Sequence, residues 1–177
     1  LSVDKVRFSS VDWGDYDRDG DLDVLLSGES PNQMDTIITK VYENTGGGNF
    51  SEVNAGLIGI HDGQLEWWDY NNDNYPDIVL AGTSDTSYVV RLYKNDKNGG
   101  FIMDSTILSE DSNFHPFDIG DVNQDGFQDI IFSQGYSGST NLYLNMPDST
   151  FKLHSHPTGR HLRRGDVEFG DYDNDGD

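Results

Sequence analysis

Short apolar runs flanked by turn residues recur along the chain, and no segment shows a sustained helical period. Runs of this length between segments rich in Gly, Asn and Asp are typical of buried β-strands. The pattern therefore predicts strands and almost no helix. Four of the predicted strands each precede a segment rich in Asp: residues 8–13, 64–68, 114–119 and 164–169. Three others each follow such a segment: residues 22–26, 78–81 and 130–132.

The Asp-rich segments align with one another. They read DYDRDGDLD (15–23), DYNNDNYPD (69–77), DVNQDGFQD (121–129) and DYDNDGD (171–177), and their first residues lie 54, 52 and 50 positions apart. A second motif recurs in phase with them: Tyr-x-Asn at 42–44, 93–95 and 143–145, with a Phe eight residues after each Tyr. Two motifs that share one period indicate an internal repeat of about 50 residues.

Each full repeat is expected to hold four antiparallel strands. A third strand should end at the Asn of Tyr-x-Asn, and a fourth should begin at the following Phe, with a Gly- or Asn-rich turn between them. Four such strands in about 50 residues are typical of a β-propeller blade. We therefore predict an all-β chain of β-propeller blades, with three full repeats and the start of a fourth, as a partial propeller or one completed by another chain. The repeats expected in this single propeller segment, residues 1–177, are 8–57, 58–108, 109–156 and a truncated 157–177.

Composition excludes several classes of partner and chemistry. The chain has 32 Asp and Glu against 11 Lys and Arg, a formal net charge of -21. Such a charge repels phosphates, so no nucleic-acid partner is expected. No apolar run approaches the roughly 20 residues of a membrane-spanning helix, so no membrane insertion is expected. The absence of Cys excludes disulfides, a thiol nucleophile and Cys-ligated zinc.

The negative charge gathers in the four Asp-rich segments, which hold 15 of the 26 Asp residues. Positions 1, 3, 5 and 9 of a segment supply side-chain oxygens, and position 7 supplies a backbone carbonyl. This all-oxygen ligand set suits Ca²⁺, about three to four ions in all. Gly at position 6 permits the positive φ of a tight turn, and Asn74 replaces it in the second segment. The predicted metal ligands are Asp15, Asp17, Asp19, Asp21 and Asp23; Asp69, Asn71, Asp73, Tyr75 and Asp77; Asp121, Asn123, Asp125, Phe127 and Asp129; and Asp171, Asp173, Asp175 and Asp177.

Two alternatives compete with this metal site. An EF-hand loop also begins D-x-D-x-D-G, but it needs a bidentate Glu at position 12. That position holds Leu26, Leu80 and Phe132 here, so the EF-hand is excluded. The other alternative is a set of Asp-rich hairpin turns that bind nothing. It would leave four Asp side chains of the first segment in mutual repulsion of about 1 kcal/mol per close pair.

The motifs resemble a known repeat family. Residues 13–23 (WGDYDRDGDLD), 41–44 (VYEN) and 47–50 (GGNF) are similar to the FG-GAP/VCBS repeat, which builds the propeller of integrin α subunits and of many secreted bacterial proteins. The resemblance covers nearly the whole chain. It implies structural calcium in the hairpin between the first two strands of each blade, a seven-bladed ring as the commonest form, and partners on the opposite face. The second segment departs most from the pattern, with Trp68 where the other copies have Gly.

Other residues of interest lie between the repeats or at shared repeat positions. All five His lie in the connections between repeats, which should lie on the face away from the Asp-rich hairpins. Acids three residues before each segment (Asp12, Glu66, Asp118 and Glu168) are expected to accept backbone hydrogen bonds. Trp13, Trp67 and Phe169 share a repeat position that predicts packing between blades. Trp68 lies outside this pattern and is expected to be exposed. The candidate ligand-binding residues are His61, Trp68, His115, His161, Arg163 and Arg164.

Three functions are compatible with the sequence. The favoured one is a calcium-stabilised extracellular module, secreted or on the cell surface, that binds a protein or glycan or serves in adhesion. The second is a structural subunit of an oligomer or extracellular filament, in which self-association completes the propeller. The third is a propeller-based polysaccharide-active enzyme, although no catalytic motif is present. The fold alone does not distinguish them.

Overall fold

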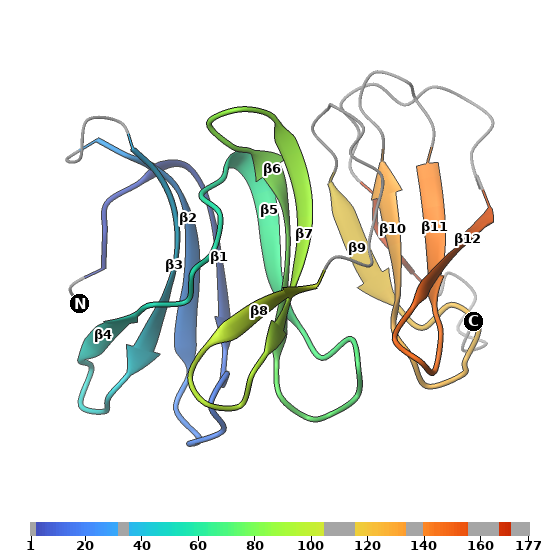
Figure 1. Ribbon diagram of the computed structural model, residues 1–177, viewed down its shortest axis with the longest axis horizontal. Helices are drawn as coiled ribbons and strands as arrows, with labels where there is room; N and C mark the ends of the chain where they lie inside the picture. The colour runs from blue at the N-terminus through green and yellow to red at the C-terminus, as the bar shows by residue number, and fades with distance from the viewer. Residues whose placement is uncertain (1–2, 32–35, 105–115, 134–139, 156–166, 171–177) are drawn as a thin grey trace. The chain divides into compact units, whose positions relative to one another are not determined.

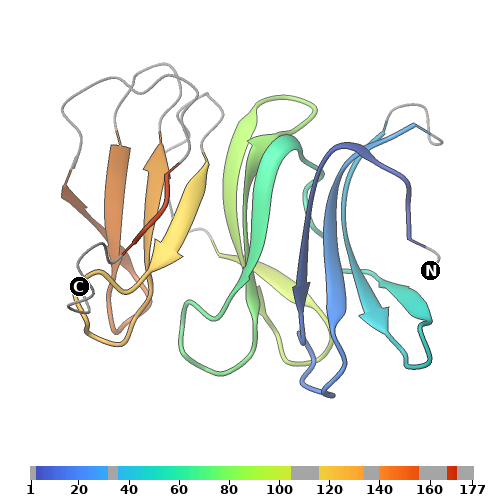
Figure 2. The same ribbon diagram turned by 180° about the vertical axis from the view of Figure 1, so that it is seen from behind.

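The computed structural model describes residues 3–31, 36–104, 116–133, 140–155 and 167–170. Its twelve strands form three four-stranded antiparallel sheets, one in each full repeat (Figures 1 and 2). The described residues contain no helix, in agreement with the all-β prediction. Within them there is accordingly no helix of the length and apolarity that would span a membrane.

In each sheet the strands follow one another in chain order. The first repeat contains β1 (Arg7–Gly14), β2 (Asp23–Ser30), β3 (Thr36–Asn44) and β4 (Phe50–Val53). The second contains β5 (His61–Trp68), β6 (Asp77–Thr83), β7 (Tyr88–Asn95) and β8 (Phe101–Asp104). The third contains β9 (Phe117–Gly120), β10 (Asp129–Ser133), β11 (Thr140–Asn145) and β12 (Phe151–Ser155).

The strand boundaries agree closely with the sequence pattern. β3, β7 and β11 end at the Asn of Tyr-x-Asn, and β4, β8 and β12 begin at the Phe that follows. One predicted strand, residues 164–169, is not confirmed. Residues 167–170 are not in a strand, because no second strand among the described residues pairs with them; residues 164–166 lie outside the description.

The chain forms two compact units. One comprises Leu1–Asp69 and Asp73–Ser112 and contains the first two sheets; the other comprises Tyr70–Asn72 and Asn113–Asp177 and contains the third. In the first unit β5 packs against β1 and β2. The core between these sheets is apolar, and its most buried members are Leu25, Val41, Ile60, Ile78 and Leu80.

An aromatic side chain of one repeat occupies the space above a glycine of the preceding repeat. A Cβ added to Gly14 would lie 2.5 Å from Cδ1 of Trp67. The same Trp67 ring stacks on Tyr16, with centroids 6.0 Å apart, and its backbone N–H donates to Asp12 Oδ2 at 2.9 Å. In the second unit Phe169 lies over Gly120 in the same way, and its N–H donates to Asp118. The packing role predicted for Trp67 and Phe169 is therefore confirmed.

Trp13 does not share that role. Its side chain is 52% exposed, although it occupies the same repeat position as Trp67. The prediction that Trp13 packs between blades is therefore wrong for the described structure. The physical reason is that no described sheet lies against this face of β1. The predicted backbone-accepting role of the acids at the strand ends is confirmed for Asp12 and Asp118.

Candidate metal centre in the Asp-rich loops

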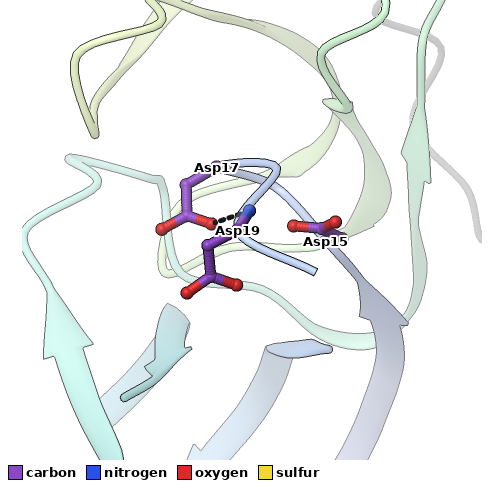
Figure 3. Close-up of side chains that lie close together, drawn as sticks. All are labelled: Asp15, Asp17 and Asp19. Carbon is purple, nitrogen blue, oxygen red and sulfur yellow. Dashed lines mark hydrogen bonds between the residues drawn. The ribbon is translucent and has the colours of Figure 1, made fainter. Parts of the chain in front are cut away.

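The loop between β1 and β2 gathers three carboxylates. Asp15, Asp17 and Asp19 each offer an oxygen, and these oxygens all lie within 4.8 Å of one another (Figure 3). The loop holds them through its own backbone: Asp17 Oδ1 accepts from the N–H of Asp19 at 3.1 Å, and Asp19 Oδ1 accepts from Asp21 at 2.8 Å. This places three of the predicted ligands in one cluster.

The loops reach this shape through two residues with positive φ. Position 6 has φ of 96° at Gly20, 66° at Asn74 and 88° at Gly126, which confirms the prediction made from the glycines. Position 4 also has positive φ, at Arg18, Asn72 and Gln124, which the sequence pattern did not predict. With the backbone turned in this way, the N–H of position 6 donates to the carboxylate of position 1, namely Asp15, Asp69 or Asp121.

The Asp at position 9 is completely buried in all three full repeats. In the first, Asp23 Oδ2 accepts from the N–H of Tyr16 at 3.0 Å and Oδ1 accepts from the N–H of Asn44 at 2.8 Å. Asp129 makes the matching pair of bonds in the third. These carboxylates therefore join the Asp-rich loop to the end of the third strand. A carboxylate has about four lone-pair sites, so these bonds leave room for a cation.

Burial makes these carboxylates hard to ionise without a cation. Burial, together with the smaller effect of neighbouring loop carboxylates, raises the pKa of Asp23 to about 6 and that of Asp77 to about 7; the pKa of Asp129 is raised for the same reasons. Hydrogen bonds from backbone amides oppose the shift only in part. A divalent cation at the loop would favour the ionised form through its charge.

In the second and third repeats the Asn of Tyr-x-Asn bonds to the Asp-rich loop of the repeat before it. Asn95 Nδ2 donates to the carbonyl of Pro76 in its own repeat at 3.0 Å and to the carbonyl of Tyr16 in the first repeat at 2.9 Å. Within the second unit, Asn145 Nδ2 donates in the same way to the carbonyls of Gln128 and Tyr70. The motif marked this Asn as the end of a strand, but its bond to the preceding loop was not predicted. Its recurrence in phase with the loops was the available signal.

The first loop fits calcium by its donor chemistry. Asp15 Oδ1 is buried and has no hydrogen-bond partner, an arrangement that is costly for a carboxylate oxygen unless a cation completes it. The other donors nearby are carboxylate oxygens of Asp17 and Asp19, and hard oxygen ligands are those that Ca²⁺ prefers. The residues that would hold the ion are Asp15, Asp17 and Asp19, with Asp23 and the carbonyl of Asp21 as the further predicted ligands.

In the second loop a lysine ammonium group lies beside one of the predicted metal ligands, Asp73. Lys97 Nζ lies 3.0 Å from Asp73 Oδ2 and also lies over the Tyr75 ring, 4.9 Å from its centroid. Lys94 Nζ lies 3.9 Å from the same oxygen. An ammonium group at position 5 competes with a metal for that carboxylate, so the second loop fits calcium less well than the first. This agrees with the irregular sequence of its segment.

The remaining predicted ligands are only partly described. In the third loop Asp125 donates its N–H to Asn123 Oδ1 at 2.9 Å, and its own Oδ1 accepts from Phe127. This repeats the bonding of the first loop. The fourth segment, with Asp171, Asp173, Asp175 and Asp177, lies outside the described residues. Its assignment as a metal loop stays a prediction.

Of the candidate ligand-binding residues, the structure describes two. His61 Nδ1 lies 3.1 Å from Asp62 Oδ2 and 3.6 Å from Glu29 Oε1, at the end of the sheets away from the Asp-rich loops. Trp68 is 3% exposed, so the expectation that it is exposed is wrong. Successive residues of a strand point to opposite faces, and both faces of β5 are covered at Trp67 and Trp68. His115, His161, Arg163 and Arg164 lie outside the described residues.

Comparison with known proteins supports one family. The profile of the FG-GAP-like repeat matches residues 69–132 and, separately, residues 121–177, which together make up more than half of the chain. A search of curated proteins found no match. The matched residues include the second, third and fourth Asp-rich segments and the Tyr-x-Asn motifs of two repeats, with the strand pattern described above. This chain is therefore a member of the FG-GAP-like repeat family.

Proposed function

We propose that this chain is a calcium-stabilised module of an extracellular β-propeller that binds a protein or glycan partner. The observation that carries the proposal is the buried, unpartnered Asp15 Oδ1 beside the carboxylates of Asp17 and Asp19. FG-GAP repeats are typical of extracellular proteins and often bind calcium. At the millimolar calcium of extracellular fluids even modest sites are filled, and the binding free energy adds to folding stability.

Recognition is assigned to the end of the sheets away from the Asp-rich loops. Arg7, Glu29 and His61 meet there: Arg7 Nε donates to Glu29 Oε2 at 2.7 Å, and His61 lies beside the other Glu29 oxygen. These polar groups come from the start of β1, the end of β2 and the start of β5. Because they lie far from the loops, a partner and calcium can bind together.

The test is thermal unfolding with millimolar calcium, with excess chelator and with magnesium. We expect a rise in Tm specific to calcium. The variant Asp15→Asn should lose most of this rise, and Asp85→Asn, an exposed Asp in another turn, should keep it. Equal Tm values in calcium and chelator would overturn the metal assignment, and an unchanged calcium response in Asp15→Asn would exclude the first loop as its source.

A further inference from the structure

The first Asp-rich loop carries a positive charge among its predicted calcium ligands. Arg18 occupies position 4 of this loop, between Asp17 and Asp19. The same position holds the neutral residues Asn72 and Gln124 in the second and third loops. An arginine beside two carboxylates can pair with either of them, and such a pair would compete with a metal ion for the same oxygens. The position of the Arg18 side chain therefore bears directly on calcium binding by this loop.

The Arg18 side chain reaches the second loop and does not pair within its own. Its Cζ atom lies over the Tyr75 ring, 5.3 Å from the ring centroid, in a cation–π contact. The ion pairs that Lys and Arg side chains form among the described residues do not include Arg18. Within this part of the chain, the carboxylate cluster of Asp15, Asp17 and Asp19 therefore has no protein cation beside it.

Tyr75 is held in a defined position by its own loop. Its N–H donates to Asp73 Oδ1 at 3.1 Å. Lys97 Nζ lies 4.9 Å from the centroid of the ring and 3.0 Å from Asp73 Oδ2, so the ring contacts a second cation that is itself fixed by an ion pair. The face of an aromatic ring attracts a cation through its quadrupole. The ring therefore provides the Arg18 guanidinium with a partner outside the first loop.

Position 4 makes a similar contact between loops within the second unit. Asn72 Nδ2 donates to the carbonyl of Gly126 in the third loop at 2.9 Å. Asn72 and Arg18 both have positive φ, at 54° and 67°. In both cases the side chain of position 4 contacts the Asp-rich loop of the next repeat. The contact of Arg18 with Tyr75 is thus one example of a recurring arrangement, in which the first loop supplies a charged group and the second an aromatic ring.

We propose that Tyr75 is a positioning residue for calcium binding at the first loop: it holds the Arg18 guanidinium over its ring and so keeps that charge off the carboxylates of the loop. The inference rests on the proposed function, because it concerns the affinity of the calcium site named there. It gives the Tyr75 side chain a role in the preceding repeat, in addition to the backbone carbonyl predicted as a ligand in its own. Without the ring, Arg18 would pair with a neighbouring carboxylate, and calcium would have to displace it.

The experiment is a calcium titration of the 177-residue chain, followed by two-dimensional NMR of the backbone amides. The Gly20 N–H donates to Asp15 Oδ2, so its resonance reports the first loop. The Gly126 N–H donates to Asp121 Oδ2 and reports the third. Removing the ring in Tyr75→Leu should raise the calcium concentration at the midpoint of the Gly20 response about threefold, an effect of the size that an exposed ion pair produces. The Gly126 response should not change.

Two control variants separate the release of Arg18 from a structural disturbance. Tyr75→Phe keeps the ring, so its first loop should bind calcium as the wild type does; Phe127 occupies this position in the third loop. Arg18→Gln removes the charge and matches the third loop, which has Gln124 at position 4. In the Arg18→Gln background, the further change Tyr75→Leu should leave the midpoint of the Gly20 response unchanged. Circular dichroism and Tm establish that each variant is folded.

The outcomes distinguish the positioning role from the calcium site itself. A Gly20 amide that does not respond to calcium in the wild type would overturn the calcium site, and the positioning role with it. A wild-type response that Tyr75→Leu leaves unchanged would overturn the positioning role alone. So would an equal loss of affinity in Tyr75→Phe, which lacks only the hydroxyl, or a loss in Tyr75→Leu that persists when Arg18→Gln is also present.

Discussion

Replacing Asn95 by Ala tests whether the Tyr-x-Asn residue is the main polar link between neighbouring repeats. Asn95 is 2% exposed, and its side chain makes three hydrogen bonds: to the carbonyls of Tyr16 and Pro76, and from the N–H of Lys97. The change removes all three and leaves two carbonyls without this donor. The bond between the Asn95 backbone and Asp77 is unaffected, because it uses the main chain.

Asn44 provides a matched control within the same unit. Its side chain accepts from the N–H of Gly46 and donates to the carbonyl of Leu22 at 3.2 Å, in a more exposed setting and, among the described residues, with no bond to another repeat. A buried acceptor left without a partner costs about 1–3 kcal/mol, and an exposed bond contributes about 0.5–1.5 kcal/mol. We therefore expect Asn95→Ala to lower the free energy of unfolding by about 3 kcal/mol and Asn44→Ala by about 1 kcal/mol.

Urea unfolding followed by Trp fluorescence measures this difference. All three Trp residues, at positions 13, 67 and 68, lie in the first unit, so the signal reports the unit that contains both substitutions. With a urea dependence of about 2 kcal/mol per molar, the midpoint of Asn95→Ala should lie about 1 M below that of Asn44→Ala. The measurement belongs at low protein concentration, where association does not contribute.

Equal midpoints for the two variants would refute the reasoning, since they would show that the inter-repeat bond contributes nothing beyond the local ones. A smaller loss for Asn95→Ala than for Asn44→Ala would have the same consequence. A lower urea dependence in one variant would instead indicate that its two repeats unfold separately, and the midpoints would then be compared for each transition.

Three further predictions concern the packing, the charge and the second loop. Gly14→Ala should destabilise the first unit by about 1–3 kcal/mol. The added Cβ would lie 2.5 Å from the Trp67 ring, which is stacked on Tyr16 and has little room to move. A urea midpoint equal to that of the wild type would contradict this prediction. In chelator, the free energy of unfolding should fall as pH rises from about 4 to about 7. Burial raises the folded-state pKa of Asp23 to about 6 and of Asp77 to about 7, so over this interval the folded protein holds protons that the unfolded chain has released. Denaturation at several pH values checks this, and a free energy of unfolding that rises over the interval would contradict it. Lys97→Ala should strengthen calcium binding at the second loop about fivefold, because it removes a positive charge 3.0 Å from Asp73 Oδ2. Isothermal titration calorimetry measures this change, with Lys5→Ala at an exposed lysine as the control. An isotherm unchanged from the wild type would contradict the prediction.

The sequence by itself determined the repeat, the strands and the loops. The spacing of Asp-rich segments and Tyr-x-Asn motifs placed the ends of β3, β7 and β11 and the starts of β4, β8 and β12 at the residues where the structure has them. These features were accessible because turn chemistry is local: the residues that need a positive φ, or that end a strand, are adjacent in the chain. The positive φ at Gly20 and Gly126 is an example.

Only the tertiary structure decided which of these residues are covered and what they bind. Trp13 and Trp67 occupy one repeat position, yet Trp13 is half exposed and Trp67 packs on Gly14; Trp68, expected on the surface, is buried. Asn95 bonds to Tyr16, 79 residues earlier in the chain. Burial and hydrogen bonding of this kind depend on which sheet lies alongside. A repeated motif carries the same local information in every copy, so it cannot distinguish a copy that has a neighbour from one that does not.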